Sequence, residues 1–193
     1  MPILRWLLDQ HFPTLEIKEG WVDLRRLRDP PRDLKTRIRT AVKLLPCDLL
    51  FVHRDSNTVG SEARRLEILT AFEEAFPGQE SRPALIPVVP VRMMEAWLLF
   101  DEAAVRWAAN NTSGTMPLRL PPLQRCETIP DPKAMLHMTL RRASGLGSSR
   151  QRRLPVSRWV HSLAGRIEDF DPLRPIDAFR ILEEDIRCCA EQF

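Results

Sequence analysis

The chain has 193 residues, of which 44% are hydrophobic and 28% are charged, and its formal net charge is +3. These values are ordinary for a globular protein and indicate neither a disordered nor a fibrous chain, and the length fits one domain, or one domain with an extension. No apolar run approaches the roughly 20 residues that a membrane-spanning helix requires, so no membrane partner is expected.

The cysteines favour a reducing compartment. The four of them (Cys47, Cys126, Cys188 and Cys189) form no CxxC pair and have no histidines nearby at zinc-ligand spacing. We therefore expect free thiols rather than a structural zinc site, and the cytoplasm as the location.

The first half of the chain alternates between helical and strand patterns. Six elements are predicted in chain order: a helix over 2–11, a half-exposed strand over 14–22, a helix over 33–45, a strand over 47–52, a helix over 60–76 and a strand over 84–91. Asp33 and Ser61 are the predicted N-caps of the second and third helices. Pro87 and Pro90 place the last strand at an edge or near its end. This alternation predicts an open α/β sheet covered by helices, with at least some parallel pairing.

The second half is predicted to be mainly helical. A short apolar helix over 93–100 precedes one that Asp101 caps and that runs to residue 109, and the proline-containing stretch 110–131 is the longest irregular segment. Asp131 as N-cap followed by Pro132 in the first turn is typical of a helix start. Three helices are predicted beyond that stretch, over 131–143, 156–167 and 176–190. We expect one domain over 1–193, with an α/β core over 1–109 and a loop and helical extension over 110–193.

A polar cluster follows the most apolar strand. Ligands of open α/β sheets collect beyond the carboxyl ends of the strands, and the strand over 47–52 is followed by His53, Arg54, Asp55 and Asn57. Asp55 and the amide oxygen of Asn57 suit a hard cation, although one carboxylate and one amide bind weakly unless other acids approach. His53 is either a general acid or base or a structural hydrogen-bonding group. Alternatively, Asp55 and Asn57 form an Asx-type turn and cap the next helix.

Glu95 is the second candidate acid. Arg92 and Glu95 are the charged residues between Pro83 and Phe100, three positions apart in an otherwise apolar segment. A carboxylate in such surroundings needs a partner. Either Arg92 and Glu95 form a structural i,i+3 pair, or Glu95 faces the same cleft as Asp55 while Arg92 faces a phosphate.

An arginine-rich segment follows the predicted helix over 131–143. Residues 141–158 contain six arginines and no acid, interleaved with serine and glycine. Guanidinium groups and flexible backbone donors both suit phosphate oxygens, so Arg150, Arg152 and Arg153 are candidate phosphate contacts. The alternative is a solvated loop. The sequence contains no GxSxG, Walker loop, GxGxxG or HExxH motif.

Three segments, 49–55, 90–101 and 129–133, together resemble a bacterial family known as domain of unknown function 4276, which is regarded as Toprim-like. The resemblance runs over nearly the whole chain. Its most specific part is Glu95-Ala96-Trp97-Leu98, and Asp131-Pro132-Lys133 supports it. Toprim domains belong to topoisomerases, primases and nucleases. In them a glutamate after the first strand and an Asp-x-Asp after a later strand hold magnesium for phosphoryl transfer.

The resemblance implies a role for each matching residue. Asp55 takes the first aspartate position, and Asn57 stands where the second would be. The glutamate would lie in a Gly-Glu-Gly-like turn just before the first helix, where this chain begins with Met1-Pro2. We therefore expect either a start upstream of Met1 or the loss of the first strand. Relatives of this family resemble partners of ATPases in bacterial defence loci.

Our first hypothesis is a Toprim-like nuclease that depends on Mg²⁺ or Mn²⁺. Asp55 would be a metal ligand, Asn57 and Glu95 auxiliary ligands, and Arg54 and Arg92 would clamp phosphate beside His53. The second is a non-catalytic module that docks onto an AAA- or ABC-type ATPase or binds DNA or RNA through 141–158, with Lys133 as a further phosphate contact. A third, a nucleotide-binding protein, has less support because no glycine-rich phosphate loop is present.

Overall fold

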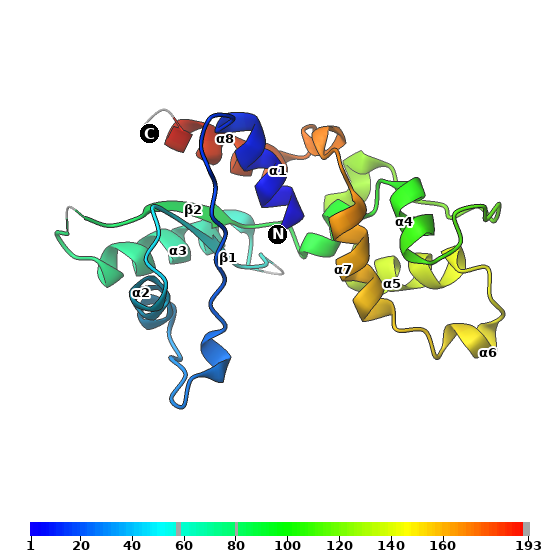
Figure 1. Ribbon diagram of the computed structural model, residues 1–193, viewed down its shortest axis with the longest axis horizontal. Helices are drawn as coiled ribbons and strands as arrows, with labels where there is room; N and C mark the ends of the chain where they lie inside the picture. Colours follow the sequence, from blue (N-terminus) through cyan, green and yellow to red (C-terminus); the bar gives the residue numbers. More distant parts are fainter. Residues whose placement is uncertain (57–58, 80, 191–193) are drawn as a thin grey trace.

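The structure is a computed structural model that describes residues 1–56, 59–79 and 81–190. Figure 1 shows an α/β part at one end of the molecule and a helical part at the other. The elements in chain order are α1 (Pro2–His11), η1 (Leu24–Arg26), α2 (Leu34–Leu44), β1 (Leu49–His53), α3 (Ser61–Ala75), β2 (Ala84–Val88), η2 (Met94–Leu98), α4 (Glu102–Ala108), η3 (Leu123–Thr128), α5 (Pro132–Ala143), α6 (Ser148–Gln151), α7 (Val156–Arg166), η4 (Asp171–Leu173) and α8 (Asp177–Ala190). Among the described helices, none is both long and apolar enough to cross a bilayer.

The sheet has two parallel strands with helices on both faces. β1 and β2 pair in register from Leu49 opposite Ala84 to His53 opposite Val88. Leu50 and Val52 pack against the buried cluster formed by α2 and α3. Alternate residues point to opposite faces of a strand, so Leu49 and Phe51 pack on the other side, towards α1 and α8. The mixed α/β architecture is confirmed, with a sheet of two strands in the described residues.

The two edges of this sheet differ. Ala84 N donates to Asp48 O, and Arg54 N donates to Val88 O. The backbone N–H and C=O groups of the even-numbered residues of β1 therefore point towards β2. The backbone groups of Leu49, Phe51 and His53 therefore point away from β2, and no described backbone group bonds to them. On the outer edge of β2 lies Pro87, which has no N–H and needs no partner there.

One large core joins the two parts. It runs from α1, α8 and β2 through η2 to α4, α5 and α7. Trp97 of η2 is completely buried and packs edge-on against Phe179 of α8, with ring centroids 5.6 Å apart. α8 thus returns from the helical part to cover the sheet (Figure 1).

The structure confirms three of the predicted helix caps. Asp33, Asp101 and Asp131 each accept a hydrogen bond from the backbone N–H three residues on, at 2.8, 2.8 and 2.9 Å. The Ser61 cap is wrong, because the N-cap of α3 is Gly60, which has a φ of +95°. Glycine takes this left-handed backbone conformation without the steric cost that a side chain brings.

Two predicted elements differ from those observed. Residues 16–22 form no strand, because they make no backbone–backbone hydrogen bond with any described residue. The helix predicted over 93–100 is a 3-10 helix of five residues, η2.

Candidate functional site

The chain segments that follow β1 and β2 stay side by side. Ser56 N donates to Pro90 O at 3.2 Å, and the buried Ser56 Oγ accepts from Arg92 N at 3.1 Å. Arg92 has a φ of +63°, in the left-handed region that is uncommon for residues other than glycine. The structure therefore brings the backbone of Arg92 to the strand end that carries Asp55.

His53 and Asp55 are the closest titratable pair at this strand end. His53 Nε2 lies 3.2 Å from Asp55 Oδ1, and both side chains are about one-third exposed or more. The two groups are not aligned for a hydrogen bond, so the buried Asp55 Oδ1 has no hydrogen-bond partner among the described residues. Asp55 does not cap α3, whose cap Gly60 gives no side-chain bond. Asn57, the predicted second ligand, lies outside the described residues.

The remaining predicted site residues do not complete a cation site. No group of three His, Cys, Asp or Glu residues in the described parts of the chain is arranged to hold a metal ion. His53, Asp55 and Glu95 therefore do not form a metal-binding group. Arg92 and Glu95 form no ion pair with each other, and Arg54 pairs with Glu67 at 3.1 Å. Glu67 lies on α3 and also accepts from Arg64 at 2.6 Å, so one carboxylate is shared by two arginines.

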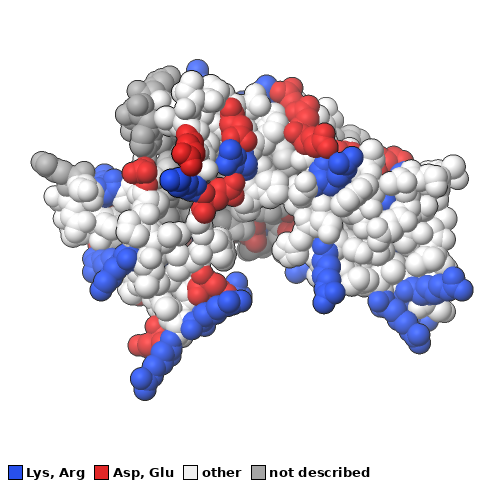
Figure 2. Space-filling view, viewed as in Figure 1, with Lys and Arg blue, Asp and Glu red and all other residues white. Residues whose placement is uncertain are grey.

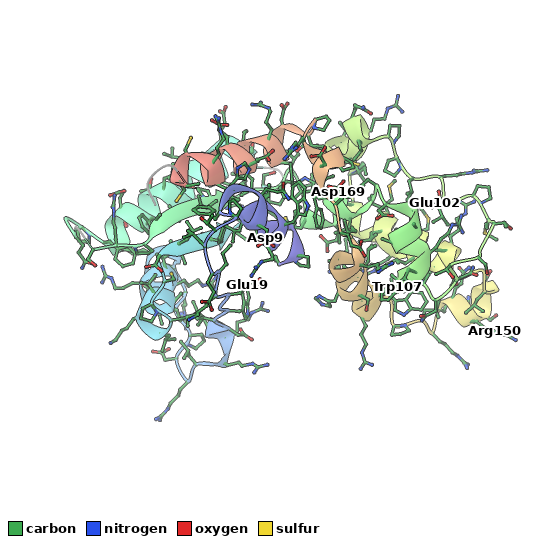
Figure 3. All side chains as sticks on the ribbon, turned by 45° about the horizontal axis from the view of Figure 1, so that its top comes forward. Asp9, Glu19, Glu102, Trp107, Arg150 and Asp169 are labelled. Atoms are coloured by element: carbon green, nitrogen blue, oxygen red, sulfur yellow. The ribbon has the colours of Figure 1, made fainter. Side chains whose placement is uncertain are left out.

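The arginines of 141–158 lie on the helical part. Arg141 and Arg142 are in the last turn of α5, Arg150 is on α6, and Arg158 is on α7. All six of these arginines have side chains without an ion pair or hydrogen bond to any described residue, whereas several exposed arginines of the other part, such as Arg174, bind carboxylates. In Figure 3 Arg150 lies at the outer tip of the helical part, away from Asp9 and Glu19.

Charge is divided unevenly along the chain. Residues 103–167 carry eleven Lys and Arg against two Asp and Glu, whereas the rest of the chain carries 18 against 24. Figure 2 shows the consequence: the lower side of the helical part has Lys and Arg without Asp or Glu, and acidic groups gather over α1 and α8. The segment 141–158 is only part of this basic region. A count of acidic residues in each predicted element reveals that the excess of Lys and Arg extends over 103–167.

Lys133 is separate from this arginine surface. It is exposed in the first turn of α5, whereas Arg141 is in the last turn. At 1.5 Å per residue, these two positions are about 12 Å apart along the helix axis. Lys133 thus lies at the opposite end of α5 from Arg150, Arg152 and Arg153.

No protein-family model matches this chain, and no similar protein was found among curated proteins or among solved structures. The resemblance to the domain of unknown function 4276 therefore stays a prediction, as do the cation site and the partners that it implies.

Proposed function

We propose that this protein binds nucleic acid through the surface formed by α5, α6 and the start of α7. The observation that carries the proposal is the set of six arginines in 141–158, whose guanidinium groups have no acidic partner among the described residues. Like charges held together without counter-charges repel each other, and a polyanion relieves that repulsion. Phosphate contacts also release condensed counterions, which is the main source of non-specific affinity.

Comparison with the α/β part supports the proposal that the arginine-rich surface binds a polyanion rather than only water. Several exposed arginines there are matched by nearby acids: Arg82 binds Glu73, and Arg5 binds Asp9. An ordinary solvated surface mixes both signs of charge in this way. The helical surface carries one sign only, which is typical of a nucleic-acid interface.

Salt dependence of binding tests the proposal. We expect fluorescence anisotropy with a labelled oligonucleotide to give an affinity that falls with salt. In the variant Arg150→Gln/Arg152→Gln/Arg153→Gln, the log–log slope should become shallower by about 0.7 to 0.9 for each phosphate that the variant no longer neutralises. The slope is informative because it reports how many phosphates the protein neutralises, independently of sequence preference.

The matched control is Arg25→Gln/Arg26→Gln/Arg28→Gln. It removes the same charge from three exposed arginines of the α/β part, where Arg25 and Arg26 already lie near Asp23. We expect this control to keep the wild-type slope. Equal slopes for the wild type and the helical-part variant would overturn the proposed function.

A metal-dependent nuclease with a Toprim-like sheet is the second candidate function. It is favoured by the buried Asp55 Oδ1, which has no hydrogen-bond partner among the described residues. Asp55 and His53 alone are too few donors for Mg²⁺, which takes six ligands, mainly oxygens, so no catalytic step is assigned to them. If this candidate holds, Asp55→Asn abolishes Mg²⁺-dependent cleavage of DNA or RNA, and cleavage by Asp55→Asn at the wild-type rate would remove Asp55 from the site.

A further inference from the structure

An open hollow lies within the arginine-rich surface. It is lined by Met116, Met138, Arg141, Arg142 and Gln151, from the loop after α4, from α5 and from α6, and its volume is about 470 Å³. Sites for small ligands usually have volumes of about 300–1,000 Å³. The hollow is therefore large enough for a group of the size of one nucleotide.

Two methionines give the hollow an apolar wall that faces water. Met116 is 47% exposed and Met138 is 61% exposed. The polarisable thioether packs favourably on aromatic rings, and a nucleobase presents such a face.

The polar groups of the hollow suit the rest of a nucleotide. Arg141 and Arg142 have no acidic partner among the described residues and match phosphate oxygens. Gln151 is fixed because its Nε2 donates to Leu146 O at 2.7 Å. Its Oε1 accepts no hydrogen bond from a described residue, so it remains available to an amino group on a base edge.

A buried arginine supports the hollow from behind. Arg106 is 8% exposed, and its Nη2 donates to Glu102 Oε1 at 2.6 Å and to Met116 O at 2.8 Å. These bonds fix the position of Met116. Arg106 Nη1 is buried without a partner among the described residues, and a Cβ added to Gly114 would lie 3.0 Å from it. The loop that carries Gly114 and Met116 therefore packs closely against Arg106.

We propose that the hollow binds one unpaired nucleotide, with the base against Met116, Met138 and Gln151 and the phosphate on Arg141 and Arg142. This inference rests on the proposed function and specifies its substrate class as single-stranded nucleic acid. Bases of single strands are free to turn out and stack on side chains, whereas those of a duplex are already stacked and paired.

The test compares a single-stranded oligonucleotide with a duplex of the same sequence, by anisotropy at one salt concentration. Met138→Ala and Gln151→Ala should each lower the affinity for the single strand, by about 2- to 10-fold for the methionine, given the usual strength of sulfur–aromatic contacts. The affinity for the duplex should stay at the wild-type value. Leu66→Ala is the matched control, because Leu66 is 65% exposed on a helix of the other part.

The outcomes separate the two proposals. If Met138→Ala and Gln151→Ala leave the ratio of single-strand to duplex affinity unchanged, the hollow takes no base, and the arginine variants still decide the proposed function. If the Arg150/Arg152/Arg153 variant binds both probes as the wild type does, the proposed function is wrong whatever the hollow variants show. Failure of the wild-type protein to bind either probe overturns both.

Discussion

Glu127 shows how one half-buried carboxyl group affects the stability of its surroundings. Its Oε1 accepts a hydrogen bond from Ala178 N at 3.2 Å, which satisfies a backbone donor in the first turn of α8. Burial raises the pKa of Glu127 above its ordinary value. The Ala178 N–H lowers that pKa, and the nearby Asp177 raises it again. The net effect is a raised pKa, so folding disfavours the ionised form.

A raised pKa predicts a definite dependence of stability on pH. The folded protein keeps a proton on Glu127 that the unfolded chain loses near pH 4.5. The free energy of unfolding therefore falls as pH rises from about that value through the folded-state pKa. Glu127→Gln keeps an acceptor for Ala178 N but cannot ionise, so it should lose less stability than the wild type between pH 4.5 and 7.

Urea unfolding at these two pH values measures the effect of Glu127→Gln. Glu16→Gln provides the control, because Glu16 is highly exposed. A Glu127→Gln variant with the pH dependence of the wild type would show that Glu127 is not the group responsible.

At the scale of elements, a paired arginine and aspartate connect α3 to α8. Arg65 donates to both oxygens of Asp185, at 2.5 and 2.6 Å, across 120 positions of sequence. The hydrogen bonds to Asp185 raise the pKa of Arg65. Both side chains are partly buried, so water screens this pair less than it screens a surface pair.

A double-mutant cycle with Arg65→Ala and Asp185→Ala should give a coupling free energy of about 1–3 kcal/mol, since hydrogen bonds to charged groups are among the stronger ones. The comparison is the more exposed pair Arg82–Glu73. A cycle with Arg82→Ala and Glu73→Ala should give about 0.2–1 kcal/mol. Equal coupling in the two cycles, measured by urea unfolding, would contradict the effect assigned to burial.

Local signals predicted the elements better than their pairing. The caps Asp33, Asp101 and Asp131 are readable from sequence because a cap and the N–H that it binds are three residues apart. The strand expected over 14–22 failed because alternation of apolar residues does not guarantee a neighbouring backbone. At the site, the hydrogen bond from Arg92 N to Ser56 Oγ joins residues 36 positions apart, which local pattern does not reveal. The ion pair of Arg54 with Glu67 was not foreseen, because it depends on how α3 packs.

At the scale of the whole molecule, the two parts share a core around Trp97. This side chain is completely buried between η2 and α8, and it packs on Phe179. The basic surface is therefore attached to the sheet by apolar packing rather than by a flexible tether. Shared packing predicts that both parts unfold together.

Trp97→Ala should lower the free energy of unfolding by about 3–5 kcal/mol, the usual cost of deleting a large buried aromatic side chain. Hydrogen exchange should then show loss of protection in α3 and α5 alike. Trp21→Ala is the control, because Trp21 is 85% exposed and should change stability by about 0.5 kcal/mol or less. Loss of protection in α5 alone would show that the two parts are independent units.

Pro87 leaves the edge of β1 as the edge of the sheet at which a further strand could pair. Because the outer edge of β2 lacks an N–H at this residue, an additional extended chain finds a continuous row of donors and acceptors only along Leu49, Phe51 and His53. A polypeptide that joined there would end beside the imidazole of His53 and the carboxylate of Asp55. The residues of such a strand would then be direct neighbours of this polar pair.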